Sequence, residues 1–188
     1  PDWGGNYKVQ YWSEDWQRAV LGYLDRIIDD GFDGAFLDII DAYLYWSDPE
    51  SGEAQVLSRE EAAERMIRFV QRLAYHARVS RGETGFMIVP LNGESLLAYD
   101  RSGAYLQTLS ALCAEDLYFT GQTPVDPEET AARRENLDLA RRAGKTVLVL
   151  DYVDSGARPV TDRVKEFRRL ALADGYLPYA GLSDRALD

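Results

Sequence analysis

The residues that could do chemistry in this chain are carboxylates placed where the predicted strands end. Gly34–Leu37 is a short apolar run behind a glycine break, and Asp38 and Asp41 follow it at once. Because the carboxyl ends of parallel strands meet at one edge of a sheet, polar groups that follow several strands can converge there. Asp38 and Asp41 follow the first of these strands, the amide Asn92 and Glu94 follow the second, Glu115 and Asp116 interrupt the third, and Asp151 follows the fourth. The structural alternative is that Asp38 only caps the next helix.

Two kinds of chemistry use several carboxylates. Glycoside hydrolysis needs one carboxylic acid to protonate the leaving oxygen and a second carboxylate as nucleophile or base. Hard metal ions also bind carboxylate oxygens, which here would be those of Asp38, Asp41 and Asp151. The single histidine, His76, and the single cysteine, Cys113, argue against a Ser-His-Asp triad and a cysteine zinc site. Carboxylates are therefore the main acid/base groups available. We expect no metal site and no cofactor, with a carboxylate-metal hydrolase kept as an alternative.

Aromatic residues near the same strand ends favour carbohydrate chemistry, because the apolar faces of sugar rings stack on such side chains. They are Trp12, Tyr43, Tyr45, Trp46, Tyr118 and Tyr152. The alternative is that some of them fill the interior. Glu115 stands out among the carboxylates, since it lies within Leu-Cys-Ala-Glu-Asp-Leu-Tyr-Phe. Apolar neighbours would favour the protonated form that a general acid needs.

Strand and helix patterns alternate along the chain. Apolar residues at helical spacing predict helices, one of them begun by the capping box Ser58-Arg-Glu-Glu61. The turn-rich segment 43–57 is expected to form a long loop at the rim of the site. The expected extended segments are 6–11, 34–37, 86–91, 111–119, 146–150 and 176–180. This alternation predicts an α/β fold with a parallel sheet and right-handed crossovers in one domain.

Length and charge narrow the class of protein. A chain of 188 residues is long enough for one domain with a core. The net charge of −11 repels a phosphate backbone, which argues against a nucleic-acid partner and suits a cationic ligand. No apolar run approaches the length of a membrane span. The chain opens with Pro1-Asp-Trp-Gly-Gly, so we expect it to begin inside a longer protein.

Several stretches of the chain match the pattern of a known family. The first is Asn6-Tyr-x-Val-x-Tyr-Trp12 followed by Trp16-Gln17. The others are Gly31-Phe-Asp-Gly-x-x-Leu-Asp38-x-x-Asp41-x-Tyr43, Pro90-x-Asn92-Gly93-Glu94, Glu115-Asp116-Leu and Val147-x-Val-x-Asp151-Tyr152. In this order they resemble the glycoside hydrolase family 114 proteins. These are endo-α-1,4-polygalactosaminidase-like, and bacterial and archaeal members were long mislabelled as cysteinyl-tRNA synthetase-related. The resemblance covers nearly the whole chain.

The resemblance implies a fold and a reaction. The fold is a (β/α)8 TIM-type barrel, of which residues 1–188 would supply about the last five βα units as a single domain without its first strands. A barrel open on one side would leave apolar sheet edges exposed, so we expect a longer protein or another chain to close it. The reaction is hydrolysis of an α-1,4-linked, galactosamine-containing polysaccharide outside the cell or at its envelope.

The resemblance also implies residue roles. Asp38 corresponds to the family's catalytic aspartate, and Glu115 best matches its partner glutamate, with Glu94 as the competing choice. The residues expected to contact the polysaccharide are Asp41, Tyr43, Trp46, Asn92, Glu94, Asp151 and Tyr152. Two other functions remain open, a non-catalytic carbohydrate-binding barrel and a carboxylate-metal hydrolase. The sequence contains neither a nucleotide-binding motif nor the basic residues of an RNA-binding surface, so a tRNA synthetase activity has little support.

Overall fold

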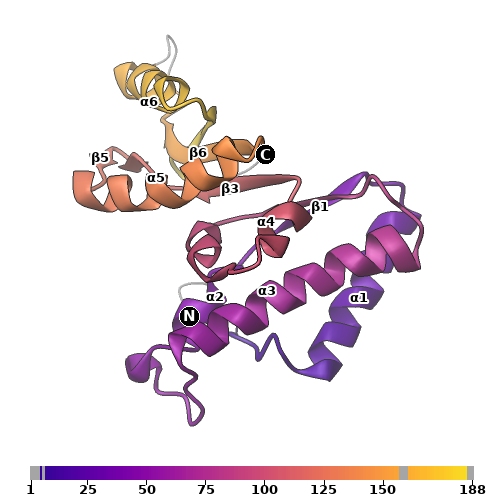
Figure 1. The fold of residues 1–188 in the computed structure, drawn as a ribbon. Helices are drawn as coiled ribbons and strands as arrows, with labels where there is room; N and C mark the ends of the chain where they lie inside the picture. The colour runs from indigo at the N-terminus through magenta and orange to yellow at the C-terminus, as the bar shows by residue number, and fades with distance from the viewer. Residues whose placement is uncertain (1–4, 6, 157–160, 186–188) are drawn as a thin grey trace.

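The computed structural model describes residues 5, 7–156 and 161–185. Strands and helices alternate along the chain, as Figure 1 shows. The helices are α1 (Glu14–Asp29), α2 (Ala42–Tyr45), α3 (Arg59–Tyr75), α4 (Ala104–Thr108), α5 (Pro127–Arg142) and α6 (Asp162–Ala173), with the 3-10 turns η1 (Pro49–Ser51) and η3 (Glu94–Tyr99) and the π-turn η2 (His76–Ser80). The strands are β1 (Gly34–Leu37), β2 (Met87–Pro90), β3 (Ala111–Glu115), β4 (Phe119–Thr120), β5 (Thr123–Pro124), β6 (Thr146–Asp154) and β7 (Leu177–Leu182).

The five longer strands are neighbours in the order in which they occur along the chain. β1 pairs with β2, β3 with β6, and β6 with β7, and every one of these pairs is parallel. A parallel bridge between Leu91 and Cys113 joins β2 to β3. The predicted α/β fold with a parallel sheet is therefore confirmed. The short strands β4 and β5 form a separate antiparallel hairpin.

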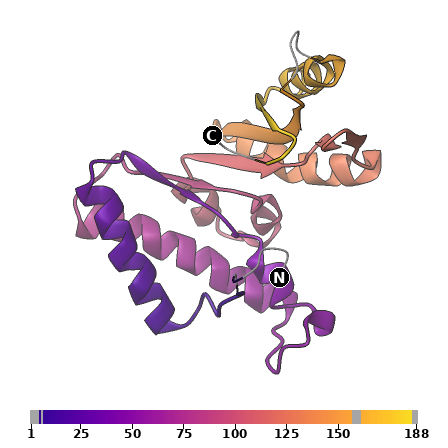
Figure 2. The same cartoon turned by 180° about the vertical axis from the view of Figure 1, so that it is seen from behind.

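The helices cover one face of this sheet and leave the other face open in the described part of the chain (Figures 1 and 2). Ile88 and Val149 point toward the helices and are fully buried. Side chains alternate between the two faces of a strand. Phe36, Met87 and Tyr179, on the opposite face, are 55%, 47% and 59% exposed. A row of apolar side chains therefore lies uncovered along the sheet.

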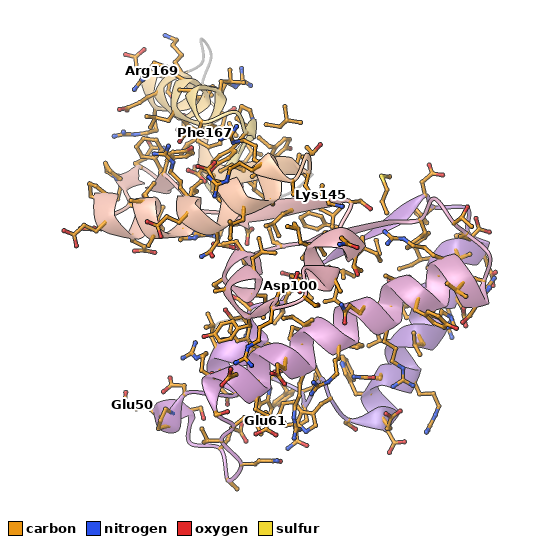
Figure 3. All side chains as sticks on the ribbon, in the orientation of Figure 1. Glu50, Glu61, Asp100, Lys145, Phe167 and Arg169 are labelled. Atoms are coloured by element: carbon orange, nitrogen blue, oxygen red, sulfur yellow. The ribbon has the colours of Figure 1, made fainter. Side chains whose placement is uncertain are left out.

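Helix packing follows the apolar stripes in the sequence. The Ser58 hydroxyl accepts a hydrogen bond from the backbone N–H of Glu61 at the start of α3, as its capping box predicts. In α6, Phe167 is fully buried against the sheet, whereas Arg169 points outward (Figure 3). No helix in the described ranges combines the length and the apolar character that crossing a membrane requires.

Four predicted segments differ from the structure. Residues 7–10 belong to no strand, and residue 6 lies outside the described part of the chain. Segment 43–57 is not an open loop, because it includes the end of α2 and the turn η1. The third strand was expected to reach Phe119 but ends at Glu115, where Asp116 adopts a positive φ of 49°. Conversely β6 runs through Asp151 to Asp154, so Asp151 lies within a strand and not at its end.

Candidate active site

The candidate site is built around Glu115, the last residue of β3. Residues two apart on a strand share a face. Glu115 follows Cys113 by two residues, and Tyr152 follows Leu150 by two residues. Cys113, Leu150 and Tyr152 pack together in one small cluster on the open face of the sheet. Glu115 and Tyr152 are therefore directed to this face at the carboxyl end of the sheet.

Asn92 fixes both the backbone and the side chain of Glu115. The Asn92 Oδ1 atom accepts a hydrogen bond from the Glu115 N–H, and Nδ2 donates to Glu115 Oε2, both at 2.8 Å. The backbone N–H of Asn92 donates to the Cys113 carbonyl at 2.9 Å. Asn92 has a φ of 57°, which asparagine tolerates better than most residues. It thus joins the ends of β2 and β3 and orients the carboxylate.

Tyr152 forms a hydrogen bond with the other carboxylate oxygen of Glu115. Its hydroxyl donates to Oε1 at 2.5 Å. Burial, followed by the contact with Glu115, raises the pKa of Tyr152, so the hydroxyl remains a donor throughout the neutral range. Hydrogen bonds from Asn92 and Tyr152 to both oxygens stabilise an ionised carboxylate. The arrangement differs from the apolar pocket that the surrounding sequence suggested for Glu115.

Arg133, from α5, holds the turn behind Glu115. Its guanidinium donates to the carbonyls of Glu115 and Asp116 at 2.9 and 3.2 Å and to Glu94 Oε1 at 2.6 Å. Glu94 is 5% exposed, and its other oxygen, Oε2, is buried without a hydrogen-bond partner among the described residues. Glu94 is thus committed to an ion pair with Arg133, whereas Glu115 carries no charge partner on its carboxylate among the described ion pairs.

Strained backbone collects at the carboxyl end of the sheet. In the described chain, the non-glycine residues with a positive φ are Ile39, Asn92, Asp116 and Arg185, at 58°, 57°, 49° and 62°. They follow β1, β2, β3 and β7 respectively. For a β-branched residue such as Ile39, this conformation is a true outlier. Strain of this kind costs about 1–3 kcal/mol per residue and is concentrated at functional sites.

A pocket of about 510 Å³ adjoins Glu115. Its acidic and amide side chains come from the ends of β1, β2 and β3 and from α5; they are Asp41, Asn92, Glu94, Glu115, Asp116, Glu129 and Asn136, with Arg133 among them. Burial, the main cause, raises the pKa of Asp41, and the nearby Asp38 and Glu94 carboxylates add to the effect. The pocket is therefore acidic.

Asp38 does not line the pocket beside Glu115 but a separate groove on the surface. It follows Phe36 by two residues and so continues the open face of β1. Its Oδ1 accepts a hydrogen bond from the N–H of Ile39 at 2.8 Å, and the side chain is exposed. Asp38 lines an apolar groove of about 560 Å³ between the 7–11 segment, α1 and β1. In the described chain, Asp38 and Glu115 share a sheet face and a sheet end, but line separate pockets.

Two aromatic residues predicted for the site, Tyr43 and Trp46, are buried away from the surface. Trp46 is 4% exposed and its indole N–H donates to the Val9 carbonyl at 2.9 Å. Tyr43 is 1% exposed, with its hydroxyl bonded to Ser95. Neither ring offers a free face for a sugar, because both are packed in the core. Their structural role reflects the tendency of large aromatic rings to fill interiors.

Asp151 is also structural in its contacts. Its side chain is fully buried, and its two oxygens accept hydrogen bonds from the backbone N–H groups of Leu117, Tyr118 and Phe119. Burial raises the pKa of Asp151 to about 6, while the three backbone bonds oppose that rise. The side chain ties the turn after β3 to β6 and leaves no oxygen for a ligand. Within the described ranges, no three His, Cys, Asp or Glu side chains are grouped so as to hold a metal ion.

Comparison with known proteins identifies the family. The family model described as Glycoside-hydrolase family GH114 matches residues 1–188. The chain belongs to glycoside hydrolase family 114. Uncharacterised proteins of Methanocaldococcus jannaschii, Thermotoga maritima and Deinococcus radiodurans are 39%, 38% and 34% identical to it over its whole length. The family 114 chain spans 53%, 56% and 54% of these relatives, or about half of each.

Sequence reasoning missed two arginines that contact this candidate site. Arg133 lies on the polar face of α5, where an arginine reads as a surface residue. Arg185 lies close to the end of the chain, beyond the last predicted strand. Neither residue belongs to a motif, and only their contacts with Glu115, Asp116 and Tyr152 reveal them.

Proposed function

We propose that this chain is part of a glycoside hydrolase that cleaves an α-1,4-linked, galactosamine-containing polysaccharide. Asp38 and Glu115 would be its two catalytic carboxylates. The observation that carries the proposal is the placement of Glu115 at the carboxyl end of the parallel sheet, with Asn92 and Tyr152 donating to its two oxygens. Family membership supplies the reaction class.

The contacts of Glu115 favour one of the two carboxylate roles. A nucleophile or general base must be ionised, and both oxygens of Glu115 accept hydrogen bonds that stabilise the charge. Asp38 then becomes the proton donor to the leaving oxygen. Asp41, whose pKa is raised by burial, is the second choice for that role. This assignment reverses the expectation that Glu115 itself is the acid.

We further propose that the fold is a (β/α)8 barrel completed by strands outside residues 1–188. Five parallel strands adjacent in chain order, with their helices on one face, are the arrangement of a barrel sector. The uncovered apolar face, which includes Phe36, Met87 and Tyr179, would then become the barrel interior. Closure would also bring the two pockets at the carboxyl end to one common mouth.

The charge of the chain agrees with an amino-sugar polymer. Free galactosamine carries an ammonium group at neutral pH, and the chain has a net charge of −11. The acidic pocket beside Glu115 provides a local counterpart. A polymeric substrate of this kind is met outside the cell or at its envelope, which is where we place the protein.

The decisive experiment digests amino-sugar polymers with the full-length protein and identifies the products by mass spectrometry. We expect Asp38→Asn and Glu115→Gln each to lower kcat/KM by about 10²–10⁴-fold, because each removes a carboxylate that acts in the transition state. Asp33→Asn and Glu83→Gln, exposed residues at the amino ends of β1 and β2, are matched controls that should retain activity. Full activity in both active-site variants would refute the assigned roles.

Neither alternative function gains a specific observation. Two of the aromatic residues on which the carbohydrate-binding alternative rested, Tyr43 and Trp46, are buried and offer no ring face to a sugar. A metal hydrolase using Asp38, Asp41 and Asp151 would need a free oxygen on Asp151, whose oxygens are engaged by backbone N–H groups. Binding of the polymer without any product, or loss of activity in a chelator, would revive one or the other.

A further inference from the structure

Arg185 joins the candidate site from the far end of the chain. It follows β7, and its backbone N–H donates to the Leu182 carbonyl at 2.9 Å. Its guanidinium carbon lies 4.3 Å from the centre of the Tyr152 ring. The same group donates to Asp116 Oδ2 at 2.5 Å. Arg185 therefore contacts both the tyrosine that donates to Glu115 and the residue that follows Glu115.

The Tyr152 ring is confined by a second contact as well, from Gly181 of β7. A Cβ atom added at Gly181 would lie 2.9 Å from Tyr152 Cδ1 and 3.2 Å from Cε1, closer than packed carbon atoms approach. Only glycine allows β7 to come this near to the ring. With Arg185 over the ring and Gly181 against its edge atoms, the hydroxyl is held toward Glu115.

We propose that Arg185 is a positioning residue for the catalytic carboxylate. By packing over the Tyr152 ring, its guanidinium keeps the ring in the orientation in which the hydroxyl donates to Glu115 Oε1. Its ion pair with Asp116 holds the turn in which Asp116 has a positive φ. This inference rests on the proposed function, in which Glu115 acts on the substrate. The direct contacts of Arg185 are with Tyr152 and Asp116, and the proposed effect on Glu115 passes through them.

We expect the contacts of Arg185 to orient the site residues more than they stabilise the fold. The side chains of Arg185 and Asp116 are 39% and 22% exposed, and an ion pair so open to water contributes little to folding. The Tyr152 ring is only 5% exposed, but the guanidinium over it belongs to a side chain that is 39% exposed, so this contact stays partly open to water and contributes moderately. A misplaced catalytic group, by contrast, costs a large factor in rate. Substitution of Arg185 should therefore alter the reaction much more than the fold.

The first test compares Arg185→Gln and Arg185→Lys in the full-length protein. We expect Arg185→Gln to lower kcat by about 10–100-fold with KM changed less than about 2-fold, since orientation and not binding is lost. Arg185→Lys should recover only part of kcat, because an ammonium can pair with Asp116 but lacks the planar group that stacks on Tyr152. Both variants should unfold within a few degrees of the wild type.

Arg163 provides a matched control. Its guanidinium carbon lies 4.5 Å from the Phe119 ring centre, and it pairs with Glu166 at 2.8 Å, so it repeats both contacts away from Glu115. Arg163→Gln should leave kcat and KM unchanged. Equal kcat values for Arg185→Gln and Arg163→Gln would overturn the proposal. A raised KM with unchanged kcat would also overturn it, because that result indicates a substrate contact.

A second readout does not depend on catalysis. A crystal structure of the Arg185→Gln variant should show the Tyr152 hydroxyl displaced from Glu115, while the Arg163→Gln variant keeps the hydrogen bond. If the wild-type protein cleaves no amino-sugar polymer, the proposed function fails, and this structural comparison still decides the role of Arg185. An unchanged Tyr152–Glu115 contact in Arg185→Gln would refute that role.

Discussion

Tyr152 and Glu115, which lie 37 residues apart in the sequence, are joined by a hydrogen bond of 2.5 Å in which the tyrosine hydroxyl donates to Oε1. Their strands, β6 and β3, are parallel neighbours, with Glu115 paired to Leu150. The pair therefore depends on sheet register, since a slip of one residue would turn Tyr152 to the helix-covered face.

Removal of the Tyr152 hydroxyl is the most direct test of this pair. Tyr152→Phe keeps the ring and removes one donor to Glu115, so we expect kcat/KM to fall about 10–100-fold as the carboxylate loses orientation and charge stabilisation. Tyr176→Phe is the matched control, because Tyr176 is also buried and donates to a carboxylate, that of Asp138, at 2.9 Å. In steady-state kinetics, Tyr152→Phe should lose activity and Tyr176→Phe should keep it, which distinguishes a role at the site from a general effect of removing a buried hydroxyl.

Asn92 should tolerate an acceptor but not a second negative charge. In Asn92→Asp one oxygen can still accept from the Glu115 N–H, but the other replaces the donor that lies 2.8 Å from Glu115 Oε2. We expect the free energy of unfolding at pH 7 to fall by about 1–3 kcal/mol and the loss to shrink at pH 4, where carboxylates take up protons. Urea denaturation at both pH values checks this. Asn136→Asp, on the wall of the same pocket, serves as the control.

Gly181→Ala should disturb the site by crowding it. The new methyl group would lie 2.9 Å from Tyr152 Cδ1, so the ring or β7 must move. We expect lower kcat together with a loss of about 1–3 kcal/mol in unfolding free energy. Gly22→Ala, in α1 with nothing within 4 Å of the added methyl group, should instead be neutral or stabilising. Thermal unfolding and kinetics of the two variants distinguish crowding from a general glycine effect.

Asp151 should matter for stability because its oxygens hold the turn after β3. Asp151→Asn places an amide NH₂ against backbone N–H donors, and we expect a loss of about 2–4 kcal/mol at pH 7. Asp126→Asn changes an exposed cap that also accepts backbone N–H groups, from Glu128 and Glu129, and should cost less than about 1 kcal/mol. Equal losses of unfolding free energy in the two variants would show that the burial of Asp151 does not increase the cost of the substitution.

Asp41 should reveal its raised pKa through the pH dependence of stability. A folded pKa above the unfolded value means that the folded state binds the proton more tightly, so this group's contribution to stability falls as the pH rises through the folded pKa. Asp41→Asn should therefore be more stable than the wild type at pH 7. The difference should vanish near pH 4 and below. Urea denaturation from pH 4 to 7 checks this, with the exposed Asp33→Asn as control.

The sequence by itself determined the local elements and the side on which chemistry gathers. Short apolar runs marked β1, β2 and β3, and helical periodicity marked α3 and α6, because each signal depends only on neighbouring residues. Asp38 and Asn92 were found in the same way, since strand ends are visible as changes from apolar to polar residues. Glu115 was found instead as a carboxylate within an apolar run, and the sequence did not show that its strand ends there. The family pattern named the same positions.

Only the tertiary structure decided what each of these groups contacts. The local sequence of Glu115 suggests an apolar pocket, but strands distant in sequence bring Asn92 and Tyr152 to its oxygens. Asp151 looks like a site residue until the N–H groups after β3 are placed on it. Arg185 carries no local signal at all. Hydrogen bonds and burial across 20 to 70 residues of chain depend on register and packing, which no single stretch of sequence contains.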